Sequence, residues 1–146
     1  MTQERVTAQR EQRLPMTATS EAEIETLVRT FYGRIREDEM LGPVFARVIG
    51  EDWEPHLKKM MDFWSSVMLT TGRYHGRPMP AHMRLKDVTP AHFDRWLALF
   101  GQTVDEVCAA EAAPAFKERA HRIAGSLQLG MFFNPATAEG RARAAD

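Results

Sequence analysis

The chain lacks most of the features that mark secreted, membrane-spanning or nucleic-acid-binding proteins. It has 146 residues but one cysteine, Cys108, so no disulfide can form within it. Its formal net charge is −1, with basic residues scattered among acidic ones, which argues against non-specific nucleic-acid binding. No apolar run approaches the roughly 20 residues that span a bilayer, and the N-terminus lacks a signal-peptide core. We therefore expect a cytoplasmic protein that binds neither membrane nor nucleic acid.

Strand-like alternation and internal repeats are also absent, and the chain shows helical periodicity instead. Ser20 and Glu23 have capping-box spacing before an apolar stripe, and Thr89-Pro90 is a typical helix start. The expected helices span about 20–38, 52–70, 89–107 and 114–133, with at most a short helical turn at 44–49. This pattern predicts an all-α fold with a flexible extension at 1–19, one domain at 20–133 and a frayed tail at 134–146.

Two histidines, His56 and His82, are separated by a helical pattern followed by the Pro/Gly-rich loop TGRYHGRPMPA. Such a loop can turn the second imidazole back toward the first, an arrangement that can hold a flat metal cofactor. Tyr32 and Trp96 lie in apolar helical stripes, and their polar tips need a partner when they are buried. Each of these residues alone is more often a packing residue. Their convergence on one apolar volume favours a cofactor site.

An iron porphyrin would explain this combination. It offers a large apolar disc, an axial position for imidazole, and anionic propionates for polar side chains. Lys59 and the Arg73-Tyr74 pair are candidates to meet the propionates. The chain has no C-x-x-C-H motif, so a haem would be bound without thioether links.

Three runs of the sequence together resemble the group III, or P-type, truncated haemoglobins. They are FYGRIREDEMLGPVF, IGEDWEPHLKKMMDFWSSVMLTTGRYHGRPMPAHMRL and HFDRWLALF, and the resemblance extends over about residues 22–132. It implies a globin-like, two-over-two helical sandwich around haem b. The short junction between Ile49 and Trp53 and the extension before residue 20 depart from the family pattern.

The resemblance also implies roles for individual residues. His82 would be the proximal iron ligand, and Tyr32, His56 and Trp96 would line the distal side. The residues expected to contact the haem are Phe31, Phe45, Lys59, Met60, Phe63, Arg73, Tyr74, Met79 and Phe93.

The expected function is reversible binding of O₂, NO, CO or peroxide, with distal donors that slow ligand release. A haem-dependent peroxidase or NO dioxygenase, coupled to an unidentified reductase, would need the same residues. A haem-free helical module whose Met- and Trp-rich groove takes a partner helix is a further alternative. Glu118 and His121 form an E-x-x-H pattern that suggests a carboxylate-bridged metal bundle, but such a site needs a second copy and two further inward glutamates, which the sequence lacks.

Overall fold

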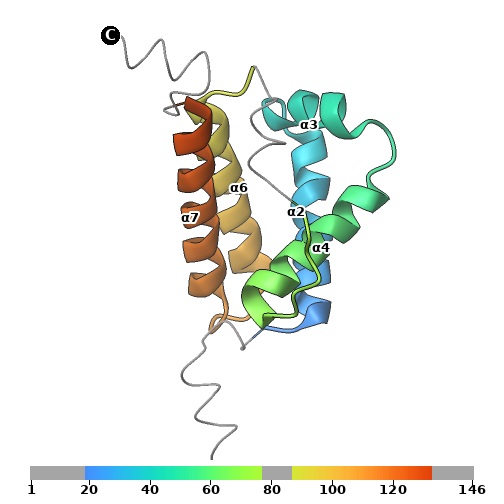
Figure 1. The fold of residues 1–146 in the computed structure, drawn as a ribbon, viewed down its shortest axis with the longest axis vertical. Helices are drawn as coiled ribbons and strands as arrows, with labels where there is room; N and C mark the ends of the chain where they lie inside the picture. The colour runs from blue at the N-terminus through green and yellow to red at the C-terminus, as the bar shows by residue number, and fades with distance from the viewer. Residues whose placement is uncertain (1–18, 77–86, 133–146) are drawn as a thin grey trace, which may run out of the picture.

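The computed structural model describes residues 19–76 and 87–132, and these contain five α-helices (Figure 1). The helices are α2 (Glu21–Glu37), α3 (Leu41–Ile49), α4 (Glu54–Leu69), α6 (Pro90–Val107) and α7 (Ala113–Phe132). No strand occurs in the two described ranges, and the all-α prediction is confirmed. The predicted site residues Met79 and His82 lie outside the described residues, as do positions 1–18 and the tail at 134–146.

The starts of two helices follow the predicted caps. The Ser20 hydroxyl accepts a hydrogen bond from the Glu23 backbone N–H at 3.2 Å, which satisfies one of the free donors at the start of α2. At α6 the Thr89 backbone N–H donates to Nδ1 of His92 at 3.0 Å, and Pro90 takes the first helical position. Local sequence therefore sets where both helices begin.

Helix α3 is longer than the predicted turn at 44–49, because it begins at Leu41 and spans nine residues. Pro43 lies in its first turn, where the missing N–H needs no partner. The Asp38 carboxylate accepts hydrogen bonds from the backbone N–H groups of Met40 at 3.2 Å and Leu41 at 3.0 Å. The Leu41-Gly42-Pro43 sequence, which lies between the predicted helix and the predicted turn, is thus the start of α3.

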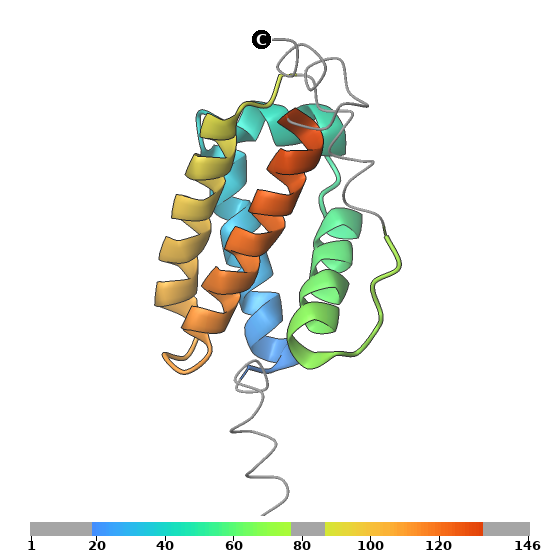
Figure 2. The same cartoon turned by 60° about the vertical axis from the view of Figure 1, so that its left-hand side comes forward.

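The helices form two packed pairs that lie across each other (Figures 1 and 2). Helix α2 packs against α3, α4 and α6, and α6 packs against α7. The chain colours run in opposite directions along α2 and α4, and again along α6 and α7, so each pair is antiparallel (Figure 1). This arrangement is the predicted two-over-two helical sandwich. None of the described helices is long and apolar enough to cross a membrane.

The buried apolar residues form two clusters. The larger one joins α2 to parts of α3, α4, α6 and α7, and the smaller one joins α6 and the C-terminal half of α7 to Val44 of α3. Several large apolar side chains pack on these clusters but keep part of their surface uncovered: Phe45, Met60, Phe63, Val67, Trp96, Leu97 and Ile123. The predicted site residues are prominent in this half-buried set.

Candidate functional site

Three of the predicted site residues form a ring cluster where α2, α3 and α4 meet. The Tyr32 phenol of α2 meets the His56 imidazole of α4 edge-on, with ring centroids 4.9 Å apart. Phe45 of α3 approaches both rings, at 6.0 Å from Tyr32 and 6.4 Å from His56. Tyr32 and His56 therefore lie side by side although 23 residues separate them in the sequence.

Trp96 of α6 joins this cluster through Phe31. The Phe31 ring lies edge-on to both Tyr32, at 5.0 Å, and Trp96, at 5.4 Å. The Trp96 indole stacks on Phe100 at 5.3 Å with an interplanar angle of 3°. Stacking of this kind limits the orientations open to the indole. The buried Phe31 ring thus links Trp96 to Tyr32, and Tyr32 in turn contacts His56.

Tyr32 is a buried residue whose hydroxyl lacks a hydrogen-bond partner among the described residues. The residue is 5% exposed, and within the described ranges no residue forms a hydrogen bond with its hydroxyl. Burial alone raises the pKa of the phenol well above its usual range, so the group stays neutral and keeps its proton to donate. Buried tyrosine hydroxyls ordinarily have a partner. The Trp96 indole N–H likewise forms no hydrogen bond with a described residue.

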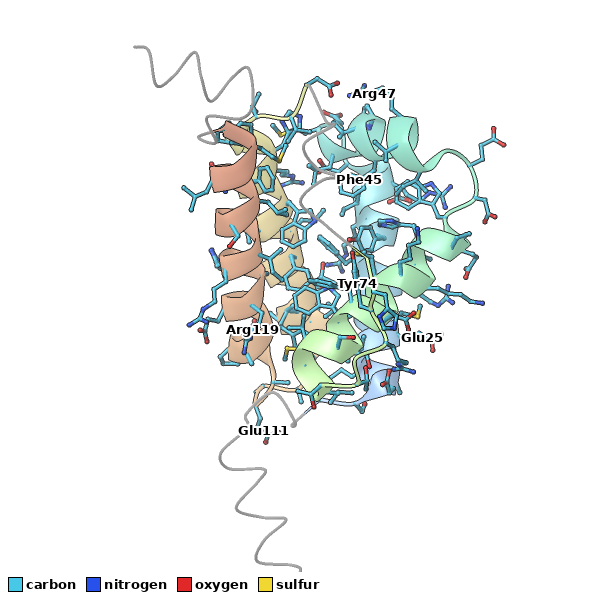
Figure 3. The ribbon with its side chains drawn as sticks, in the orientation of Figure 1. Glu25, Phe45, Arg47, Tyr74, Glu111 and Arg119 are labelled. Atoms are coloured by element: carbon cyan, nitrogen blue, oxygen red, sulfur yellow. The ribbon has the colours of Figure 1, made fainter. Side chains whose placement is uncertain are left out.

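The other residues predicted to contact a haem occupy different environments. Met60 and Phe63 are half-buried on α4, and Phe63 meets Tyr74 edge-on at 5.2 Å. Phe93 is buried in the smaller cluster, where it meets Phe132 at 6.1 Å. Figure 3 draws Phe45 and Tyr74 toward the middle of the molecule, whereas Arg47 and Glu111, for example, lie at its outside.

The residues predicted near the propionates, Lys59, Arg73 and Tyr74, differ in their exposure and in their hydrogen-bond partners. Arg73 donates hydrogen bonds to Glu21 and to the Ser65 hydroxyl, the latter at 2.6 Å, and so ties the segment after α4 to the start of α2. The Ser65 hydroxyl also donates to Glu21 at 2.7 Å. This hydrogen bond is the largest cause of the lowered pKa of Glu21, and the hydrogen bond and charge of Arg73 lower the pKa further. Lys59 is exposed. Partial burial raises the pKa of Tyr74, whose backbone N–H donates to Ser66 at 2.9 Å.

The sequence reasoning missed Trp53. Its indole stacks on Phe45, with centroids 6.3 Å apart, and meets the His56 ring edge-on at 6.2 Å. A signal was present, because residues three apart at a helix start face the same side. Trp53 precedes His56 by three residues.

The E-x-x-H pattern on α7 does not assemble a metal site within the described residues. Glu118 forms an ion pair with Arg122 at 3.0 Å, and His121 is exposed. No group of three or more His, Cys, Asp or Glu side chains able to hold a metal ion occurs in 19–76 or 87–132.

Comparison with known proteins gives one consistent family. The model of the bacterial-like globin family matches residues 18–128. The group 3 truncated hemoglobin ctb of Campylobacter jejuni is 34% identical over 108 residues, which cover 72% of this chain and 85% of that protein. The crystal structure of a group III truncated hemoglobin from C. jejuni has a TM-score of 0.75 and 31% identity, covering 78% of this chain and 92% of that one.

The chain therefore belongs to the bacterial-like globins, as one of their group III truncated haemoglobins. As a globin it binds haem. The described residues fit that group, because large apolar side chains on α3, α4 and α6 remain partly uncovered. In addition, the ring donors of Tyr32 and Trp96 have no hydrogen-bond partner among the described residues.

Proposed function

We propose that this globin binds O₂ or another diatomic ligand, such as NO or CO, reversibly on a non-covalently held haem b. When bound, the haem supplies the iron that takes the ligand. His82 would hold the haem iron, and Tyr32, His56 and Trp96 would face the ligand. The coarse function and the role of His82 rest on family membership, and the ring contacts of Tyr32, His56 and Trp96 support their distal roles.

The Tyr32 hydroxyl is the observation that carries the proposal, because it belongs to a buried residue and lacks a hydrogen-bond partner among the described residues. A polar group in such surroundings is stabilised when it donates to a bound ligand. A tyrosine phenol is neutral across the physiological range, and burial raises the pKa of Tyr32 further, so the hydroxyl keeps its proton to donate.

The haem would be held by apolar contact and by a few polar groups at its edge. Phe31, Phe45, Met60, Phe63, Met79 and Phe93 are the proposed apolar contacts. Lys59, Arg73 and Tyr74 are the proposed propionate partners. For Arg73 this role requires the guanidinium to bind a propionate in addition to its present hydrogen-bond partners, Glu21 and Ser65.

The distal donors should make ligand release slow. The Tyr32 hydroxyl and the Trp96 indole N–H would stabilise negative charge on a ligand by donating hydrogen bonds to it. A hydrogen bond to a charged group is worth about 1.5–3 kcal/mol, so losing one donor should accelerate O₂ release by roughly ten- to hundredfold. Slow release suits capture, sensing or redox turnover of the ligand better than bulk transport.

The test is the O₂ dissociation rate of Tyr32→Phe and Trp96→Leu, measured by stopped flow on the reduced, haem-loaded protein. Each variant removes one donor, and we expect each to release O₂ faster. Thr103→Val is the matched control, since Thr103 is a fully buried hydroxyl on α6 that donates to the Leu99 carbonyl at 2.8 Å. It should lower stability and leave the O₂ rate unchanged. Unchanged rates in both donor variants would refute the donor assignment.

A further inference from the structure

Trp53 is fixed at the corner between α3 and α4. It is 6% exposed, and its indole N–H donates to the carbonyl oxygen of Gly50 at 3.0 Å. Gly50 ends α3 with φ +81°, a conformation that favours glycine and aims this carbonyl away from the helix ladder. The guanidinium carbon of Arg36, on α2, lies 5.0 Å from the indole centroid in a cation–π contact. The indole is therefore held by two separate segments of the chain.

The fixed indole contacts two residues of the proposed distal side. It stacks on Phe45 with an interplanar angle of 26° and meets His56 nearly perpendicular, at 83°. Phe45 and His56 also contact each other, so the three rings pack pairwise. Among the described rings, Trp53 reaches Tyr32 only through these two neighbours.

We infer that Trp53 is a positioning residue, which fixes the orientation of the His56 imidazole relative to the Tyr32 hydroxyl. A ring packed against an imidazole removes some of the rotamers that the imidazole could otherwise adopt. A functional side chain keeps its geometry when the residues behind it are themselves fixed. The consequence appears in ligand kinetics only if Tyr32 and His56 face the ligand, so this inference rests on the proposed function.

The test compares Trp53→Leu in two backgrounds, the natural sequence and His56→Leu, using reduced, haem-loaded protein. With His56 present, we expect Trp53→Leu to change the O₂ dissociation rate by about two- to tenfold, which is the lower part of the range of coupling between contacting residues. It should also broaden or split the infrared C–O stretching band of the CO complex, because His56 then samples several orientations. In the His56→Leu background, the same substitution should leave the rate and the band nearly unchanged.

Two further variants separate positioning from general stability. Trp53→Phe keeps a ring but loses the bond to Gly50, and it should retain a single infrared band. Phe116→Leu removes a buried aromatic ring that contacts Trp64 and none of the described rings around His56. It should lower the unfolding midpoint without altering the band.

The outcomes distinguish this inference from the proposed function. Equal effects of Trp53→Leu in both backgrounds would show that it does not act through His56 and would overturn the inference. If Trp53→Leu changes neither the O₂ dissociation rate nor the infrared band, while Tyr32→Phe clearly accelerates O₂ release, the inference is overturned and the proposed function stands. If Tyr32→Phe and Trp96→Leu also leave O₂ release unchanged, the donor assignment in the proposed function fails and the inference fails with it.

Discussion

Replacing Asp38 should weaken the junction of α2, α3 and α6. The Asp38 side chain is only 7% exposed and accepts hydrogen bonds from two backbone N–H groups at the start of α3. It also accepts from Arg95 of α6, through Nε at 2.8 Å and Nη2 at 2.6 Å. Asp38→Ala would leave the two backbone donors and the guanidinium without this acceptor.

The size of the effect follows from which of these bonds water can replace. Arg95 is 48% exposed, so water can take over as its hydrogen-bond partner when Asp38 is replaced. Loss of this pair therefore adds little to the cost, although Arg95 is the largest cause of the lowered pKa of Asp38. The two backbone bonds to the carboxylate then dominate, and their loss should cost about 2 kcal/mol of unfolding free energy. Asp38→Asn keeps one acceptor oxygen and should cost about half as much, roughly 1 kcal/mol.

Urea unfolding followed by circular dichroism measures this change. With an m-value of about 2 kcal/mol/M, Asp38→Ala should lower the midpoint by about 1 M. Glu118→Ala is the control, since its ion pair with Arg122 is mostly exposed and should contribute almost nothing. All three proteins are compared at the same haem saturation, because bound haem itself raises the midpoint.

The pH dependence gives a second check on the same residue. The hydrogen bonds from Arg95, helped by those from Leu41 and Met40, hold the pKa of Asp38 below its ordinary value. The charge-dependent part of the stabilisation is therefore complete above the unfolded pKa of about 3.9 and is lost as pH falls through the lower folded pKa. The stability difference between the natural protein and Asp38→Asn should accordingly begin to shrink as pH falls below about 4, and it should vanish only below the folded pKa of Asp38. The reasoning would be refuted if the unfolding midpoint of Asp38→Ala equalled that of Glu118→Ala. It would also be refuted if the stability difference between the natural protein and Asp38→Asn were as large at pH 3 as at neutral pH.

Two further predictions concern residues away from the proposed haem contacts. Gly33 is exposed within α2 with open space around it, so Gly33→Ala should stabilise by about 0.5–1 kcal/mol. In Gly42→Ala the added carbon would lie 2.9 Å from a backbone oxygen of α2, so the substitution should destabilise the protein by about 1–3 kcal/mol. Unfolding midpoints that shift in the same direction in Gly33→Ala and Gly42→Ala would contradict these two predictions. Burial, and then the charge of Glu23, raises the pKa of the Cys108 thiol to about 12, so the native protein should react very slowly with a thiol reagent at pH 8 and rapidly in denaturant. Fast labelling of the native protein would show that the thiol is accessible and ionised.

The fold was largely predictable because its helices begin at local signals. Ser20 and Thr89 mark starts that depend on hydrogen bonds within three residues, and the structure places α2 and α6 there. Helix α3 was underestimated because its cap comes from Asp38, which belongs to the end of the preceding helix. That bond depends on how tightly the chain turns between the two helices, and the spacing of apolar residues carries no such information.

The sequence singled out Tyr32, His56 and Phe45, which contact one another in the structure, but it gave neither their pairings nor Trp53. Resemblance to a family identified Tyr32 and His56, while their contact depends on how α2 crosses α4. The sequence did not predict the partner of Arg73 in the structure. Arg73 was predicted to meet a propionate, and in the structure it binds Glu21, which lies 52 residues earlier in the chain. Long-range partners of flexible charged side chains follow from the packed structure and leave no local pattern.

The absorbance spectrum of reduced His82→Gly, recorded with and without added imidazole and then under CO, tests the central claim most directly. If His82 is the bond that holds the iron, the variant should lose haem during purification, and imidazole should restore a natural Soret band. A variant that keeps the natural spectrum and binds CO without imidazole would show that another residue holds the haem.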